Sequence, residues 1–115
     1  MTNRFYHNPR CSKSRQALAL LNEQGATFET IEYLTQPLSS QQLQQLFDKL
    51  GVALDEFVRS GEAEYTELGF NQNKPSAEQL FAAMQDHPKL VQRPIYETDT
   101  HAVIGRPPER VLTLV

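Results

Sequence analysis

Hydrophobic and polar positions along this 115-residue chain alternate between strand-like and helix-like patterns. Residues 4–7 include two aromatics and are followed by Asn8-Pro9, which predicts a short strand that ends in a turn. From about Ser12, apolar residues recur at helical spacing, and Gly25 stands where a glycine commonly ends a helix. Residues 27–34 alternate in character and predict a second strand. The chain is therefore predicted to begin as strand, helix, strand.

The middle of the chain predicts helices. Ser39 with Gln42, and Ser76 with Gln79, have the spacing of capping boxes. Behind each box lies an apolar stripe at helical spacing, made of Leu43, Leu46, Phe47 and Leu50 in the first case and of Leu80, Ala83 and Met84 in the second. We expect the first helix to stop at Gly51, the second to stop at His87-Pro88, and a short helix at residues 54–59 between them.

The last part of the chain predicts a hairpin and a helix. Residues 95–98 and 102–104 flank a polar turn, and Pro107-Pro108 suits the first turn of a helix that carries Val111, Leu112 and Val115. A strand–helix–strand unit gives a parallel pair, whereas a hairpin adds antiparallel strands. We therefore expect an α/β fold, with one mixed sheet covered by helices, and the length suits a single domain over residues 1–115.

Composition and charge narrow the classes of function. The net charge is −3, so we expect no general electrostatic binding to nucleic acid. The longest apolar run covers only residues 17–21, and we therefore expect no export signal and no membrane partner. A single cysteine excludes an internal disulfide framework, a CxxC pair and a cysteine-rich zinc site. We expect a cytoplasmic protein, whose thiol stays reduced.

The single cysteine, Cys11, stands between the first strand and the first helix. The free N–H groups and the positive dipole end of a helix start favour a thiolate there, as do the neighbouring cations Arg10, Lys13 and Arg15. His7, four residues earlier, can add charge or a hydrogen bond. A lone cysteine is often a small buried hydrophobe, so two interpretations are open. The polar and charged neighbours favour the nucleophile.

The same segment has the features of an anion site. The N–H groups of a helix start, with the hydroxyls of Ser12 and Ser14, can hold a tetrahedral oxyanion. A thiolate in such a site would attack an oxyanion or a disulfide, and an anionic substrate would require further cations. Arginine binds oxyanions well, and Arg59, Arg93 and Arg106 each stand beside Gly or Pro at the end of an element. Most arginines in loops are only solvated, so spacing alone leaves their role open. No metal site is expected, because His7 and Cys11 have no clustered acids beside them.

Four segments in order along nearly the whole chain carry a resemblance to a known family. They are HNPRCSKSR, VRSGEAEYTELG, QLFAAMQDHPKLVQRPI and GRPPERVLTLV. Together they resemble the ArsC-type arsenate reductases, which are glutaredoxin-linked members of the thioredoxin-like superfamily. The combination HNPxCxxSR with RP-I and GRPPE is specific, whereas no single piece would be. The resemblance implies a thioredoxin-like fold with a mixed four-stranded sheet and a helical insertion at about residues 38–90.

The resemblance also implies a reaction, the reduction of arsenate to arsenite at a single cysteine. Cys11 corresponds to the family's nucleophile, whose thiolate attacks arsenate. Glutathione then attacks the adduct and glutaredoxin reduces it, with no bound cofactor. His7 corresponds to the histidine that helps to activate the thiol.

The remaining site residues implied by the resemblance surround this thiol. Arg59, Arg93 and Arg106 correspond to the three arginines that hold the oxyanion, and Ser14 and Arg15 support the thiolate. In thioredoxin-like folds a cis proline faces the active cysteine, and X–Pro bonds adopt cis at modest cost. We therefore expect Pro94 to be cis and to place Arg93 next to Cys11.

Two other functions are compatible with the sequence. The first is a monothiol oxidoreductase that handles glutathione mixed disulfides, because a C-x-x-S site can still exchange with glutathione. The second is a non-catalytic regulator resembling the Spx-like proteins, which share the fold and bind RNA polymerase. Several of those proteins carry a CxxC switch, and this chain has Ser14 at the second position. The missing switch and the three arginines make the regulator the weaker hypothesis.

Overall fold

The computed structural model describes residues 3–115, which form two compact units. The first comprises the described residues up to Gln36 together with Arg93–Val115, and the second is Pro37–Gln92. None of the helices in residues 3–115 is long and apolar enough to cross a membrane. The predicted helical insertion at about 38–90 falls within the second unit, and the single-domain organisation stays a prediction.

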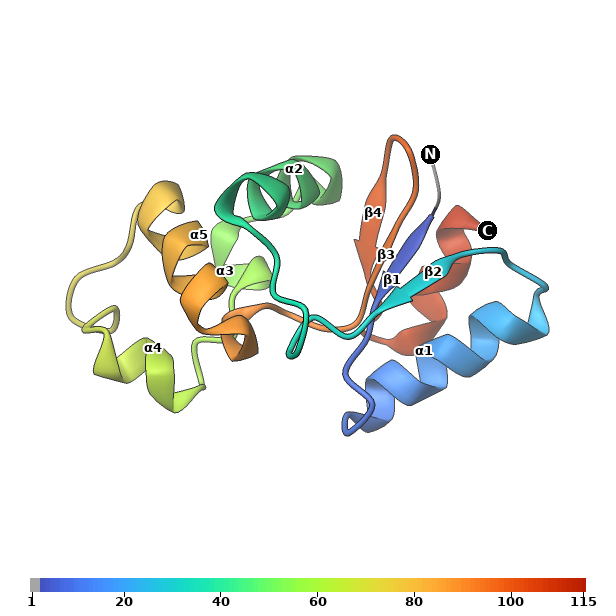
Figure 1. Ribbon diagram of the computed structural model, residues 1–115, viewed down its shortest axis with the longest axis horizontal. Helices are drawn as coiled ribbons and strands as arrows, with labels where there is room; N and C mark the ends of the chain where they lie inside the picture. Colours follow the sequence, from blue (N-terminus) through green and yellow to red (C-terminus); the bar gives the residue numbers. More distant parts are fainter. Residues whose placement is uncertain (1–2) are drawn as a thin grey trace. The chain divides into compact units, whose positions relative to one another are not determined.

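The first unit is built on a four-stranded mixed sheet with the strand order β2-β1-β3-β4 (Figure 1). Its strands are β1 (Arg4–Tyr6), β2 (Glu29–Ile31), β3 (Ile95–Glu97) and β4 (Ala102–Ile104). Strand β1 pairs in parallel with β2 and antiparallel with β3, while β3 and β4 form the antiparallel hairpin. The α/β fold with a mixed sheet is confirmed.

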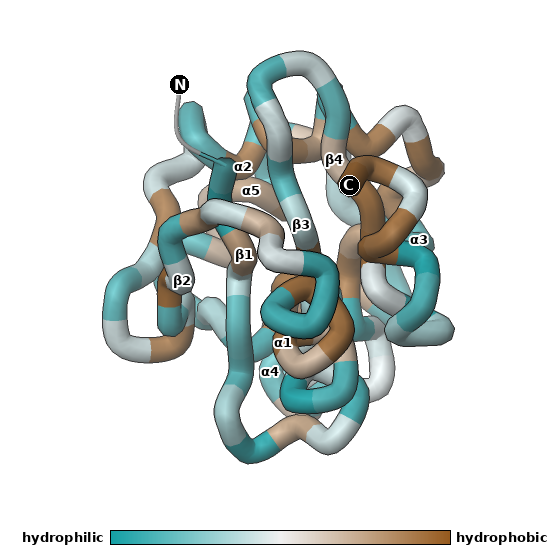
Figure 2. Tube along the Cα trace, turned by 90° about the vertical axis from the view of Figure 1, so that its right-hand side faces the viewer, coloured by the Kyte–Doolittle hydropathy of each residue, from teal (hydrophilic) through white to brown (hydrophobic). Residues whose placement is uncertain are grey.

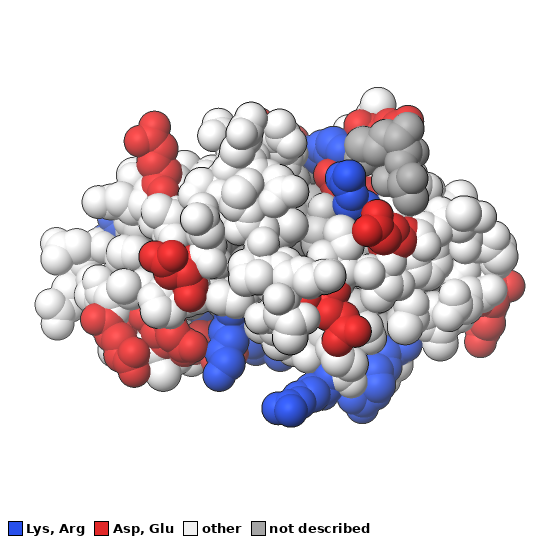
Figure 3. Space-filling model, in the orientation of Figure 1, with Lys and Arg blue, Asp and Glu red and all other residues white. Residues whose placement is uncertain are grey.

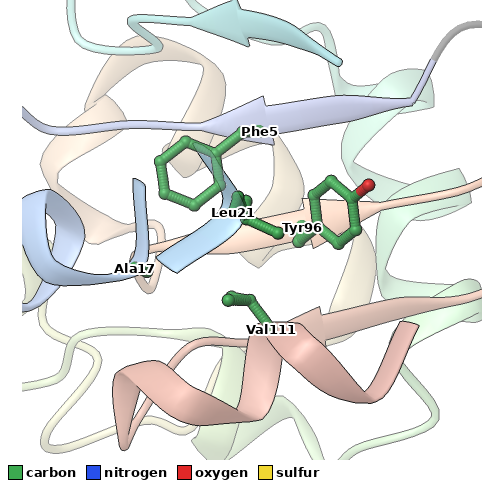
Figure 4. Close-up of a cluster of buried hydrophobic side chains, with 5 residues drawn as sticks. All are labelled: Phe5, Ala17, Leu21, Tyr96 and Val111. Atoms are coloured by element: carbon green, nitrogen blue, oxygen red, sulfur yellow. The ribbon is translucent and has the colours of Figure 1, made fainter. Parts of the chain in front are cut away.

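Two helical segments of the first unit pack on the sheet, namely α1 (Ser12–Glu23) and the 3₁₀ segment η2 (Pro108–Leu114). The buried residues of α1 are Ser14, Ala17 and Leu21, and Figure 2 shows hydrophobic and hydrophilic positions interspersed along the tube of this helix. Gly25 follows the helix with φ at +69°, a left-handed conformation that glycine adopts without strain. The cluster in Figure 4 fills the space between the sheet and these segments, and it consists of Phe5, Ala17, Leu21, Tyr96 and Val111.

The secondary-structure elements of the second unit are helices. These are α2 (Ser40–Leu50), α3 (Leu54–Phe57), α4 (Ala63–Glu67), α5 (Ala77–Asp86) and the 3₁₀ turn η1 (Pro88–Leu90). Both capping boxes are present with both of their hydrogen bonds, at Ser39–Gln42 and Ser76–Gln79. The rings of Phe47, Phe57 and Phe81 lie with their centroids 5.5–6.1 Å apart, so they form the aromatic core of this unit.

Strand β2 is shorter than predicted. It covers Glu29–Ile31, whereas the alternating pattern predicted residues 27–34. In the sheet β2 lies at the edge, and β1, its partner, is itself only three residues long. Beyond Ile31 the chain turns, with the N–H groups of Thr35 and Gln36 donating to the carbonyl of Glu32 at 3.1 and 3.0 Å.

Two helical details also differ from the predictions. Helix α4 was not predicted, because it has five residues and its N-cap residue, Glu62, makes no side-chain capping hydrogen bond. Val115 was predicted on the apolar side of the last helix but is 56% exposed. The segment is a 3₁₀ helix, in which residues three apart align, so Leu114 rather than Val115 packs on the core beside Val111.

Candidate active site

Cys11 occupies the N-cap position of α1, after the loop that leaves β1. Its carbonyl starts the helix by accepting the N–H of Arg15 at 3.0 Å, and its own N–H donates to the carbonyl of Asn8 at 3.0 Å. The side chain of Asn8 accepts the N–H of Arg10 at 3.0 Å. These bonds fix the turn that presents the sulfur. The thiol is free and the residue is half-buried.

The pKa of the Cys11 thiol lies below its usual value. Partial burial is the largest single influence and acts against this, because it disfavours the charged thiolate. The backbone N–H groups of Ser14 and Lys13 and the charges of Arg93 and Arg106 lower the pKa and together outweigh burial. The thiol makes no capping hydrogen bond, so several nearby dipoles and charges stabilise the thiolate in place of one strong bond.

Arg106 brings a guanidinium to the sulfur from the other end of the chain. Its Nη2 lies 3.9 Å from Sγ of Cys11, and its Nε donates to the carbonyl oxygen of Arg93 at 2.8 Å. This second bond ties the two arginines together beside the thiol. The Arg93–Pro94 peptide bond is cis, as predicted, and the Arg106–Pro107 bond is also cis, which was not predicted.

Gly105 permits the chain to approach this closely. Its N–H donates to the carbonyl of Pro94 at 2.8 Å. A Cβ at this position would lie 2.8 Å from Cγ of Pro94 and 3.0 Å from Cγ1 of Val111, so only glycine fits without a shift. Sequence reasoning used Asn8 only as a turn signal and assigned no role at the site to Asn8 or Gly105, although each stands beside a predicted site residue.

His7 and Ser14 form a buried pair beneath the thiol-bearing loop. His7 is 6% exposed and Ser14 is fully buried, and Nδ1 of His7 lies 2.6 Å from Oγ of Ser14. The same Oγ accepts the N–H of Asn8 at 3.0 Å. Burial lowers the pKa of His7, and the positive charge of Arg15 lowers it further. The negative charge of Glu32 raises this pKa and partly offsets the lowering. The side chain of His7 thus bonds to Ser14 and not to the thiol itself. The backbone N–H of Ser14 in turn favours the thiolate of Cys11.

Arg15 and its cationic neighbours surround the loop. Nη1 of Arg15 donates to the carbonyl of Pro9 at 2.9 Å and braces the segment before Cys11. Arg10, Lys13 and Arg15 are all exposed. In Figure 3, cationic side chains gather along the lower edge, in the region where Figure 1 shows the loop between β1 and α1. Anions that approach this loop therefore meet positive charge.

The third predicted oxyanion ligand, Arg59, belongs to the second unit. It follows α3, its N–H donates to the carbonyl of Leu90 at 2.7 Å, and its Nη1 lies 2.6 Å from Oε1 of Glu62. The structure thus brings Arg93 and Arg106 to Cys11, while the contribution of Arg59 to the same site stays a prediction.

Residues 3–115 contain no group of three or more His, Cys, Asp or Glu side chains that could hold a metal ion.

A single activated thiol at a helix start, faced by arginines, on a four-stranded mixed sheet defines the class of the protein. It is a thioredoxin-like protein whose cysteine at the helix start has two arginines near it. The particular family follows from comparison with known proteins. The sequence matches the ArsC family over residues 6–114, and the chain belongs to this family.

Relatives and solved structures agree with this assignment. The chain is 40% identical to an arsenate reductase of Neisseria meningitidis over 109 residues, which are 94% of this chain and 93% of that protein. It is 45% identical over 113 residues to the uncharacterized protein YfgD of Escherichia coli, covering 97% of this chain and 95% of that one. The solved structure of an arsenate reductase from Vibrio cholerae superposes with a TM-score of 0.93 at 43% identity, over 100% of this chain and 98% of that one.

Proposed function

We propose that this protein reduces arsenate to arsenite through a thiolate at Cys11, with glutathione and glutaredoxin as reductants. The observation that supports this most directly is the 3.9 Å contact between Nη2 of Arg106 and Sγ of Cys11. A guanidinium in this position favours the thiolate and also binds an oxyanion that the sulfur attacks. Relatives named arsenate reductase support the choice of arsenate.

The proposed reaction balances with two thiols from outside the chain. The Cys11 thiolate attacks arsenic and displaces one arsenate oxygen, which leaves as water after protonation. Glutathione then adds to the arsenic of this adduct and displaces a second oxygen, which also leaves as water. The glutaredoxin thiolate attacks the glutathione sulfur, so a mixed disulfide forms while the As–S electron pair reduces arsenic to As(III), and water then releases arsenite from Cys11. In sum, one arsenate and two external thiols give one arsenite, one disulfide and one water, because the two electrons gained by arsenic come from the two thiols that are oxidised to the disulfide. The cytoplasm, which keeps glutathione reduced, is the compartment that we propose for it.

Each remaining predicted site residue has a proposed role. Arg93 and Arg106 hold the arsenate oxygens beside the sulfur, and Arg59 is the third oxyanion ligand. His7 acts through Ser14, because its hydrogen bond holds the residue whose N–H favours the thiolate. Arg15 braces the loop, and Pro94 sets the position of Arg93. The resemblance to the family supports these roles.

The test is arsenite formation from arsenate in the presence of glutathione, glutaredoxin, glutathione reductase and NADPH. We expect wild type to consume NADPH with arsenate and Cys11→Ser to lose this activity. Arg110→Gln is the matched control, because Arg110 is an exposed arginine of η2 and should leave the rate unchanged. Equal rates for wild type and Cys11→Ser across a range of arsenate concentrations would refute the proposal.

A monothiol exchange reaction is the second candidate. The pattern Cys11-Ser12-Lys13-Ser14 supports it, because the position of a resolving cysteine is taken by a serine that is fully buried. Turnover of a glutathionylated peptide without arsenate would favour this function. Failure of Cys11 to form any glutathione adduct would exclude it.

A further inference from the structure

A cavity of about 350 Å³ lies beside the loop that carries Cys11. Its volume falls within the range of small-molecule sites, roughly 300–1,000 Å³. Four consecutive residues that lead into Cys11 form one wall, namely His7, Asn8, Pro9 and Arg10. Three residues after β2 form the other wall, namely Glu32, Leu34 and Thr35. All seven belong to the first unit.

The two walls carry opposite charges. Arg10 contributes an exposed guanidinium and Glu32 an exposed carboxylate, and neither forms a salt bridge within residues 3–115. Pro9 and Leu34 supply apolar surface between them. A ligand that satisfies both walls therefore carries one anionic and one cationic group on a partly apolar body.

The proposed reaction needs a small thiol next to Cys11, because the chain has no second cysteine. Arg10 is the residue before Cys11, and neighbouring Cα atoms lie only about 3.8 Å apart. An extended tripeptide spans roughly 10 Å. A ligand of this size that binds in the cavity is therefore long enough to extend beyond Arg10 toward Cys11.

We propose that this cavity binds the external thiol as a zwitterionic peptide, with its carboxylate at Arg10 and its ammonium at Glu32. This inference rests on the proposed function, since it assigns a place to the first of the two thiols. Arg10 and Glu32 are specificity-determining residues here. They select thiols that carry both charges over thiols that are neutral or carry one charge.

Binding is tested with S-methylglutathione, which has the charged groups of glutathione but no reactive thiol. In titrations of the full chain followed by NMR, we expect shifts at the amides of the two walls. Arg10→Gln and Glu32→Gln should each weaken binding roughly fivefold, equivalent to about 1 kcal/mol. Glu29→Gln is the control, because Glu29 is an exposed carboxylate of β2 outside the cavity, and it should change binding less than twofold.

The pairing of Glu32 with the ligand ammonium is tested by a double-mutant cycle, in which two ligands, with and without the ammonium, are each bound to wild type and to Glu32→Gln. N-acetyl-S-methylglutathione lacks the ammonium, so it should bind wild type roughly fivefold more weakly than the parent ligand does. Against Glu32→Gln the two ligands should bind equally. An equal loss in both proteins, or shifts confined to residues outside the two walls, would overturn the inference.

This outcome is separable from that of the proposed function. Cys11→Ser should still bind S-methylglutathione, because binding does not use the sulfur. If it binds while wild type makes no arsenite, only the proposed function fails. If wild type makes arsenite while Arg10→Gln and Glu32→Gln keep the wild-type KM for glutathione, only the inference about the cavity fails.

Discussion

At the residue scale, the state of Cys11 depends on a balance between burial and nearby positive groups. Burial alone would raise the pKa of the thiol, and the helix N–H groups and two arginines lower it below its usual value. Arg106 contributes twice, because it lies 3.9 Å from the sulfur and also bonds the carbonyl of Arg93. Removal of one such group should therefore shift the balance measurably.

We expect Arg106→Gln to raise the pKa of Cys11. The lost positive charge had favoured the thiolate, so half-maximal alkylation of the thiol should move to higher pH. The measurement is the rate of reaction with iodoacetamide against pH. Arg110→Gln should leave the profile in place. A profile for Arg106→Gln that coincides with wild type would show that its charge does not act on the sulfur.

His7 predicts a pH dependence of stability. Burial lowers the pKa of His7 in the folded chain. In the unfolded chain its pKa has the usual histidine value of about 6.5. Between these two pKa values the unfolded chain binds more protons, so the free energy of unfolding falls as the pH drops through that window.

The comparison is urea unfolding of wild type and His7→Gln at pH 7 and at about pH 5.5, below the usual histidine value. Glutamine can still bond Ser14, so the variant is expected to fold. Wild type should lose more stability on acidification than His7→Gln does. A smaller loss in wild type would mean that His7 gains its proton more readily in the folded chain.

At the element scale, local signals predicted helices better than strands. A capping box forms between residues three apart in sequence, so it can be predicted from a local pattern. The boxes that begin at Ser39 and Ser76 are both present as predicted. The length of β2 depends on its partner β1, which no local pattern contains. The short helix α4 has neither a side-chain cap nor a long apolar stripe, so its sequence contains no pattern that predicts a helix.

The close approach at Gly105 predicts a large effect from one methyl group. Gly105→Ala places Cβ against Pro94 and Val111, so neighbouring atoms must move, and overpacking of this kind costs roughly 1–3 kcal/mol. Gly61→Ala is the matched control, because a Cβ there meets nothing within 4 Å. The free energy of unfolding in urea measures both. Equal stability of the two variants would contradict the tight packing at Gly105.

The candidate site was predictable to the extent that chemistry follows from sequence neighbours. Cys11 at a helix start could be singled out, because the helix and the cations lie beside it in sequence. The spacing left the role of Arg106 open, since it lies 95 positions from Cys11 and no local pattern signals a contact over that separation. Asn8 and Gly105 were missed because their effect lies in backbone geometry.

At the scale of the whole molecule, net charge and local charge have opposite signs. The chain carries a net charge of −3, yet the Cys11 loop and the first turn of α1 hold three exposed cations, and two arginine charges act on the thiol. Within a Debye length of about 10 Å at 0.1 M salt, the local charges dominate the field that a small ion experiences. Anions should therefore be drawn to the thiol in spite of the acidic composition.

This predicts that Cys11 prefers an anionic reagent. The rate ratio of iodoacetate to iodoacetamide should be higher for the folded chain than for the same chain unfolded in urea. It should fall at 1 M salt, where the Debye length is about 3 Å. If the ratio were lower in the folded chain and rose with salt, the net charge would outweigh the local arginines.

The contact between Cys11 and Arg106 also has a consequence for the chain during its synthesis. Ribosomes make chains from the N-terminus at about 5–20 residues per second, so the thiol emerges several seconds before the arginine that stabilises its thiolate. Strand β3, which lies beside β1 in the sheet, also comes from the late part of the chain. A nascent or truncated chain therefore lacks the two arginine charges that help to lower the pKa of the thiol. The full lowering of this pKa requires that the last part of the chain has folded into place.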